Sequence, residues 1–251
     1  MFKSTLGTLV AAMLALTPMA HAADGTILQR ALADPARKDQ SEADARRHPA
    51  ELLALAELRP GARVLDLVPG SGYWTRIISA AVGPKGRVYG VWPEAYSKMA
   101  VSDVQALRAL ASNPHYANVT VLEQKSVTLS APERLDVVWT SQNFHDYDNP
   151  FMGKPSSAAF ARTVYGLLKP GGVFVVIDHQ AASGRGIKDT DTLHRIERDT
   201  VVREAVAAGF KLEGESAVLR NAADPLTIKV FDKSIRGRTS QFALKFRKPA
   251  A

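Results

Sequence analysis

Residues 64–75 read Val-Leu-Asp-Leu-Val-Pro-Gly-Ser-Gly-Tyr-Trp-Thr, a short apolar run followed by a glycine turn and a helix-like segment. This order predicts a strand, a tight loop and a helix. Gly70 and Gly72 let the backbone approach a ligand closely, and Asp66 can accept hydrogen bonds from a sugar or an amine. The spacing matches neither the GxGxxG of dinucleotide-binding folds nor the phosphate-binding loop. The stretch therefore favours a nucleoside ligand with few phosphates, and a purely structural turn is the alternative.

Composition bounds the class of protein. The chain has 251 residues with 46% apolar content, which is typical of a globular protein with a full core. We expect one α/β domain over residues 23–251. Because there is no cysteine, a disulfide framework, a thiolate metal site and a cysteine nucleophile are excluded. The net charge is +7, with a dense basic set at residues 229–248, but no nucleic-acid motif accompanies it, so nucleic acid is not an expected partner.

The N-terminus has the pattern of a secretory signal. Lys3 precedes an apolar run over about residues 6–20, which ends in Ala20-His21-Ala22. We predict that residues 1–22 are a signal peptide cleaved after Ala22, and that the mature protein is periplasmic or secreted, without stable membrane insertion. A membrane anchor is the alternative, but the run is shorter than a spanning helix needs.

The rest of the chain alternates strands and helices. Residues 23–60 read as helical and are expected to form an N-terminal helical cover. Beyond them, alternation implies a parallel sheet covered on both faces. The expected strands are 63–68, 87–91, 119–123, 135–140 and 173–178, with connecting helices at 73–82, 95–112, 156–168 and about 190–208. Three late strands, at 211–219, 226–231 and 241–247, fit a closing antiparallel hairpin.

Four features in this order resemble the class I S-adenosylmethionine (SAM)-dependent methyltransferases. They are residues 66–72, the strand 87–91 that opens after Gly86, Leu135-Asp136-Val137-Val138-Trp139, and the Leu-Lys-Pro-Gly-Gly turn at 168–172. Further stretches are similar to a family of exported bacterial predicted methyltransferases: 140–146, 178–179, 189–196, 219–221, 235–237 and 245–249. The resemblance implies a Rossmann-like α/β sheet of about seven strands, mostly parallel with the last strand antiparallel. It also implies SAM as cofactor and an unidentified small molecule as methyl acceptor.

The sequence departs from the class pattern at positions that concern the cofactor. Val68 replaces the first glycine of the usual motif, Trp92 stands where an acid normally binds the ribose, and Gln124 stands near the usual adenine acid. We expect Glu94 to reach the ribose, Trp92 to stack on the adenine and Gln124 to bond its edge. The residues expected to bind the cofactor are Asp66, Pro69, Gly70, Ser71, Gly72, Tyr73, Trp92, Glu94, Gln124 and Ser141.

Two histidine–aspartate pairs follow neighbouring strands. His145 and Asp146 come just beyond the fourth strand, and Asp178 and His179 come at the end of the fifth. Parallel strands end at the same edge of the sheet, so we expect both histidines to face one pocket. Because histidine titrates near neutral pH, we predict that His145, Asp146 and His179 are catalytic, with either histidine as base or as a group that orients the acceptor.

Asp191 and His194 are three residues apart at the start of the expected helix 190–208, where helix capping is the simpler explanation. Together with the two pairs they could supply oxygen and nitrogen ligands, but no spacing is a recognised ligand motif, so we predict no metal site. Three functions stay open: a SAM-dependent methyltransferase, a non-catalytic periplasmic ligand-binding protein that kept the fold, and a metal-assisted hydrolase. The absence of acidic residues at the usual ribose-binding and adenine-binding positions favours the non-catalytic binding protein.

Overall fold

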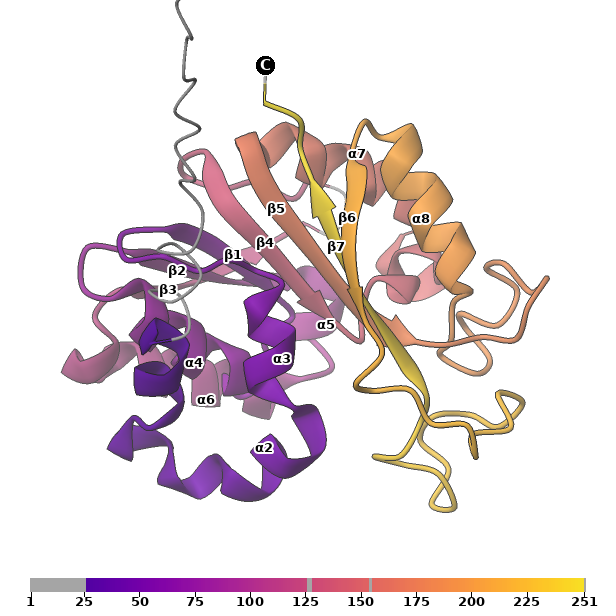
Figure 1. The fold of residues 1–251 in the computed structure, drawn as a ribbon, viewed down its shortest axis with the longest axis horizontal. Coiled ribbons are helices and arrows are strands. Elements are labelled where there is room, and N and C mark those ends of the chain that lie inside the picture. Colours follow the sequence, from indigo (N-terminus) through magenta and orange to yellow (C-terminus); the bar gives the residue numbers. More distant parts are fainter. Residues whose placement is uncertain (1–25, 126–127, 154, 251) are drawn as a thin grey trace, which may run out of the picture.

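A sheet of seven strands forms the centre of the protein (Figure 1). The computed structural model describes residues 26–125, 128–153 and 155–250. The strands are β1 (Arg63–Leu67), β2 (Arg87–Pro93), β3 (Val119–Gln124), β4 (Leu135–Ser141), β5 (Leu168–His179), β6 (Lys211–Ser216) and β7 (Gln241–Arg247), in the order β3-β2-β1-β4-β5-β7-β6. β1 to β5 pair in parallel, whereas β7 pairs antiparallel with β5 and β6. The predicted mostly parallel sheet with an antiparallel last strand is confirmed.

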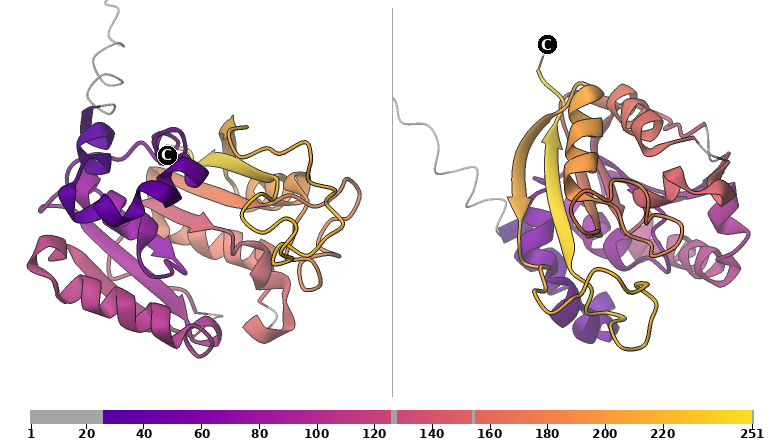
Figure 2. Two further views of the ribbon diagram at one scale, coloured as in Figure 1. Left: turned by 90° about the horizontal axis from the view of Figure 1, so that it is seen from below. Right: turned by 90° about the vertical axis from the view of Figure 1, so that its right-hand side faces the viewer.

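Helices cover both faces of this sheet (Figure 2). Before β1 come helical residues 26–32, η1 (Pro35–Gln40), α2 (Ser41–Arg47) and α3 (Pro49–Ala54). Between β1 and β3 lie α4 (Tyr73–Val82), α5 (Glu94–Ser97), α6 (Val101–Ser112) and η2 (Pro114–Tyr116). Between β4 and β6 lie η3 (His145–Asp148), η4 (Pro150–Met152), α7 (Ser157–Leu167) and α8 (Arg198–Ala207).

The core has two halves, one on each face of the sheet. In β1, Val64 packs in a cluster with side chains of α3, α4 and α6, whereas Leu65 packs in a cluster with side chains of α7 and α8. Both side chains are fully buried. Burial of successive residues is what parallel strands with two covered faces require. It fixes the strands against sliding and holds the carboxyl ends of β1, β4 and β5 at one edge.

Two expected helices differ from the structure. The helix predicted over 95–112 is divided into α5 and α6, because Ala100 has non-helical angles (φ −110°, ψ 41°) at the start of α6. The helix predicted from about 190 begins only at Arg198. Residues 190–194 form turns instead, and His194 has a left-handed φ of 54°, which a helix does not allow. Asp191 and His194 therefore do not share a helix face.

The strand predicted over 226–231 is also wrong. Leu226 has a φ of 61°, and its N–H donates to Oδ1 of Asp224 at 3.0 Å, so the chain turns just after Pro225. The glycine turn at 168–172 is part of a long β5: Leu135 pairs with Leu168, but Val137 pairs with Val173. The intervening residues form a bulge in which Gly171 has a φ of 77°.

Within the described residues, none of the helices combines the length and the apolar character that a membrane span needs. The predicted signal peptide, residues 1–22, lies outside the described part of the chain, so its cleavage stays a prediction.

Candidate active site

The two glycines of the loop between β1 and α4, Gly70 and Gly72, have different roles. A Cβ on Gly72 would lie 3.0 Å from Cδ2 of Leu110 and 3.1 Å from Cδ1 of Leu107, so Gly72 allows α6 to pack closely against the loop. A Cβ on Gly70 would meet nothing within 4 Å, and Gly70 has a φ of 58°. Gly70 therefore leaves bare backbone beside open space, as a ligand loop requires, whereas Gly72 has a packing role.

A cavity of about 760 Å³ lies over the carboxyl ends of β1, β4 and β5. The β1–α4 loop forms one side of it and the segments after β4 and β5 form the other. Of the predicted site residues, those that line the cavity are Asp66, Pro69, Gly70, Ser71, Tyr73, Ser141, His145, Asp146 and His179. The structure thus brings the glycine loop and both histidines to one cavity.

Asp66 and Arg47 lie on the loop side of the cavity. Asp66 is buried and accepts a hydrogen bond from Thr75 Oγ1 at 2.7 Å. Burial raises the pKa of this carboxyl to about 7, although Thr75 and the charge of Arg47 act against the shift. Arg47, the last residue of α2, places Cζ 4.5 Å from the ring centroid of Tyr73, and burial lowers its pKa. A guanidinium and a carboxyl group in one wall suit a zwitterionic ligand.

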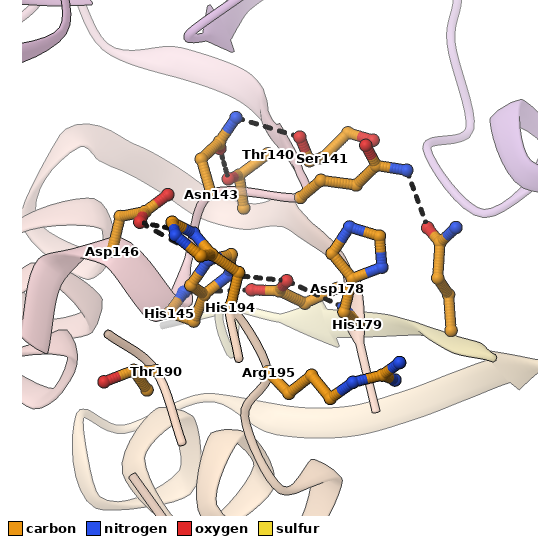
Figure 3. A network of polar contacts seen from close by, with 12 residues as sticks. Thr140, Ser141, Asn143, His145, Asp146, Asp178, His179, Thr190, His194 and Arg195 are labelled. Carbon is orange, nitrogen blue, oxygen red and sulfur yellow. Dashed lines mark hydrogen bonds and ion pairs between the residues drawn. The ribbon is translucent and has the colours of Figure 1, made fainter. Parts of the chain in front are cut away.

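The opposite side contains a buried histidine–carboxylate pair (Figure 3). Nδ1 of His145 lies 2.8 Å from Oδ1 of Asp178, and the backbone N–H of His145 donates to Oδ2 at 2.9 Å. Burial lowers the pKa of His145, but the charge and hydrogen bond of Asp178 outweigh it and raise the pKa to about 9. The imidazole of His145 is therefore protonated at neutral pH.

Asp146 and His194 complete a cluster with His145 (Figure 3). Nε2 of His145 lies 3.3 Å from Oδ1 of Asp146 and 3.2 Å from Nδ1 of His194. Asn149 donates to Asp146 Oδ1 at 2.9 Å, and the hydroxyl of Tyr96 bonds Oδ2. Burial and the neighbouring charge of His145 lower the pKa of His194 to about 4, so its ring is neutral.

His179 is the third histidine that lines the cavity. Its ring centroid lies 6.4 Å from that of His145, and its Nδ1 lies 2.9 Å from Oγ1 of Thr239. Burial lowers the pKa of His179 to about 3, so its ring is neutral at neutral pH. Among the described residues no hydrogen-bond partner contacts its Nε2, and His179 lines the cavity. Both histidines thus face one cavity, one charged and one neutral.

Four residues expected to contact the cofactor do not line the cavity, namely Gly72, described above, and Trp92, Glu94 and Gln124. Trp92 is packed in the core on the α4 and α6 face and does not line the cavity. Glu94 begins α5 with an exposed side chain outside the cavity. Gln124 is held by its own loop, since its amide donates to the Ser130 carbonyl and accepts from the Ser130 N–H.

Sequence reasoning missed several residues of the cavity wall, among them Arg47, Tyr96, Asp103 and residues 229–231. Tyr96 lies in α5, directly after β2, and the bend at Ala100 between α5 and α6 places Asp103 at the cavity as well. Asp103 is a carboxylate in the first turn of α6. Their position after β2 was the available signal, because ligands of such sheets bind beyond the carboxyl ends of the strands. Arg47 belongs to the N-terminal helices and had no such signal.

Comparisons with known proteins match part of this sequence. The profile of the protein-L-isoaspartate(D-aspartate) O-methyltransferase family matches residues 33–129. A protein-L-isoaspartate O-methyltransferase from Ignicoccus hospitalis is 40% identical over 73 residues, which cover 29% of this chain and 32% of that protein. The chain thus matches about a third of the length of this curated relative.

Solved structures extend the likeness to the whole fold. A SAM-dependent methyltransferase from Aquifex aeolicus is 19% identical, with 90% of this chain and 98% of that chain covered and a TM-score of 0.58. The [4+2]-cyclase SpnF is 16% identical, with 92% and 95% covered and a TM-score of 0.62. NodS, an N-methyltransferase from Bradyrhizobium japonicum, is 12% identical, with 84% and 99% covered and a TM-score of 0.57.

The fold and the site together define the class. This chain has the class I SAM-dependent methyltransferase fold. The matching family profile and two of these three solved structures are named as methyltransferases. The SpnF structure shows that the same fold also occurs in a protein named for a different reaction.

Proposed function

We propose that this protein is a SAM-dependent methyltransferase that acts on a small molecule. The observation that supports this most directly is the single cavity that joins the glycine loop and Asp66 with His145 and His179. Its volume of about 760 Å³ is in the range of small-molecule sites. A cofactor pocket and an acceptor pocket in contact are what group transfer requires.

The residues on the loop side fit the parts of SAM. Arg47 matches the carboxylate of the amino-acid end, and Asp66 matches the ammonium group. Gly70 gives the ligand access to the backbone. Asp103 supplies, from the first turn of α6, the hydroxyl-binding carboxylate that β2 lacks. Bound SAM supplies a methyl group that is already activated on a sulfonium, so the chain has only to bind, orient and deprotonate.

The histidine side of the cavity fits an acceptor that carries a hydroxyl or an amine. The acceptor atom forms a bond to the methyl carbon while the carbon–sulfur bond breaks and its electron pair stays on sulfur. The acceptor proton passes through Nε2 of His179, which faces no protein partner within the described residues, and on to solvent. The ring does not keep this proton, because burial lowers the pKa of His179 to about 3. His145, fixed by Asp178, and Asp146 orient the acceptor.

The methyltransferase proposal can be tested by comparing the binding of SAM with that of 5′-methylthioadenosine. Calorimetric titration of Arg47→Gln should show SAM affinity lowered by at least about tenfold, the scale of a lost charged hydrogen bond. Affinity for 5′-methylthioadenosine, which has no amino-acid end, should be unchanged. Arg46→Gln is the matched control, since Arg46 pairs with Glu42 on the exposed face of α2. Failure of the unmodified protein to bind either ligand would overturn the proposal.

A non-catalytic ligand-binding protein is the second candidate. It is favoured by Trp92 and Glu94, neither of which offers a ribose-binding acid at the end of β2. SAM binding by the unmodified protein would count against it.

Export is proposed for the same protein. The pattern of residues 1–22 supports cleavage after Ala22 and a periplasmic or secreted mature protein. Intact-mass analysis of the protein recovered from periplasmic extract should give a chain that begins at Ala23. Recovery of the uncleaved chain from the cytoplasm would contradict it.

A further inference from the structure

Three side chains of the cavity wall place ligand atoms at the corners of a small triangle (Figure 3). Nε2 of His145 and Nδ1 of His194 are 3.2 Å apart. Oδ1 of Asp146 is 3.3 Å from the first nitrogen and 3.7 Å from the second. Tetrahedral donors at about 2.0–2.2 Å from one zinc-like ion lie about 3.3–3.6 Å apart, so the triangle already has the size of a metal site.

Neighbouring groups orient two of these ligand atoms. Asp178 occupies Nδ1 of His145 and thereby leaves Nε2 directed at the other two side chains. Asn149 and Tyr96 bond the two oxygens of Asp146. A carboxylate behind a histidine ligand is the usual support of protein metal sites, because it fixes the tautomer and the ring orientation.

The backbone at His194 is a separate sign of a constrained position. Its φ of 54° lies in the left-handed region, which is uncommon for a residue other than glycine. The surrounding turns hold the residue there, and the imidazole edge contacts His145 with ring centroids 5.4 Å apart. Strained backbone of this kind concentrates at functional sites.

Two buried carboxylates supply negative charge beside the triangle. The side chains of Asp146 and Asp178 are 2% and 0% exposed. Within the described ranges their ion pairs are with histidines, and neither carboxylate pairs with a lysine or an arginine. Buried carboxylates are normally paired with a cation or bound to metal. A bound metal ion would replace the proton on Nε2 of His145 as the counter-charge of these two carboxylates.

We propose that His145, His194 and Asp146 bind one divalent transition-metal ion through Nε2, Nδ1 and Oδ1. Two imidazoles and one carboxylate suit zinc, iron(II) or manganese(II) better than calcium or magnesium. All three residues line the cavity, so the remaining positions of the ion face the space assigned to the acceptor. An acceptor with an oxygen donor would fill them. Metal binding itself is independent of the proposed methyl transfer, but the role in holding the acceptor rests on it.

Cobalt(II) is the probe that tests the site. Protein stripped with a chelator should bind one cobalt ion per chain and develop the visible absorption of a nitrogen- and oxygen-ligated ion. His194→Gln should lower cobalt affinity by at least about tenfold to a hundredfold, the loss known even for residues that support a ligand. His194 is 22% exposed, so this variant should keep its fold. His115→Gln is the matched control, because His115 pairs with Asp34 far from the cavity.

Thermal unfolding gives a second readout. Cobalt or zinc should raise the melting temperature of the unmodified protein and of His115→Gln but not of His194→Gln. Equal metal affinity in all three proteins, or no binding in any, would overturn the metal site. SAM titration of the same metal-free samples reports on the proposed function alone, so each proposal can fail without the other.

Discussion

Asp178 binds His145 at two points, with Oδ2 accepting the backbone N–H at 2.9 Å and Oδ1 lying 2.8 Å from Nδ1. Asp178 belongs to β5, and His145 begins η3 just beyond β4. β4 and β5 are adjacent and parallel. The carboxylate therefore joins the ends of two neighbouring strands and sets the direction in which Nε2 of His145 points.

Loss of that carboxylate should affect chemistry more than cofactor binding. Asp178→Asn keeps the size of the side chain and an acceptor for the backbone N–H but removes the charge that fixes the ring. Once a methyl acceptor has been identified, we expect turnover to fall on the order of a hundredfold, which is the usual effect of losing an acid–base or orienting group. The affinity for SAM should stay unchanged. Asp199→Asn, an exposed carboxylate on α8, is the control. Near-native turnover in Asp178→Asn would show that the pair is structural.

A side chain at Gly70 should obstruct the cofactor without disturbing the core. Gly70→Asn is the suitable change, because asparagine tolerates a left-handed backbone and nothing lies within 4 Å of the new Cβ. Calorimetry should show SAM affinity lowered by more than about tenfold, equivalent to about 1.4 kcal/mol. Gly61→Asn is the matched control, with a φ of 84°, equally open space and a place before β1. If both variants bind SAM normally, the ligand does not approach this loop.

Asp66 should make stability fall as pH rises. Its pKa is about 7 in the folded protein against 3.8 in the unfolded chain, so between these values the folded state holds a proton that the unfolded state has lost. The free energy of unfolding therefore decreases from about pH 4 to pH 7 on account of this group. Asp66→Asn removes the titration and should be more stable than the unmodified protein at about pH 8 but not at about pH 4. Urea unfolding at both pH values measures this, and equal differences at the two would contradict it.

The buried pair Arg195–Asp224 should be essential to the cavity wall formed by residues 229–231. Arg195 has no exposed side-chain surface, bonds both oxygens of Asp224, and donates to the carbonyl oxygens of Gln180 and Ile228. Arg195→Met leaves a buried carboxylate without its partner and should lower the free energy of unfolding by about 3–5 kcal/mol. Arg198→Met breaks partly exposed pairs with Asp199 and Glu215 and should cost about 1 kcal/mol or less. If denaturant titrations show similar losses in the free energy of unfolding for Arg195→Met and Arg198→Met, the buried pair is no more important than the exposed ones.

The sheet was predictable because its signal is local. Each inner strand is an apolar run bounded by turn residues, and runs such as residues 63–67 are buried on both faces. The glycine turn and the two histidine–aspartate pairs could be placed at one edge for the same reason, since parallel strands all end there. Knowing where the strands end was enough to bring His145 and His179 to one cavity.

The rest depended on backbone angles that the sequence pattern does not show. Apolar spacing over 190–208 resembled a helix, but the left-handed φ of His194 turns the chain and brings its ring to His145. The bend at Ala100 likewise places Asp103, in the first turn of α6, at the cavity. Trp92 occupies the sequence position of the ribose-binding residue of the class, but its side chain packs in the core. A large aromatic side chain at the end of a covered strand is stabilised more by burial than by exposure to the cavity.

The place of β7 governs the order in which this protein can be assembled. β7 covers residues 241–247, later in the chain than every other described strand, yet it lies between β5 and β6. Among the described strands, β6 pairs only with β7, so residues 211–216 stay unpaired until residues 241–247 have been synthesised. During synthesis, β1 to β5 can pair while the outer edge of β5 stays open. Removal of residues 241–247 would thus detach two strands rather than one, and would leave an exposed edge prone to association with other chains.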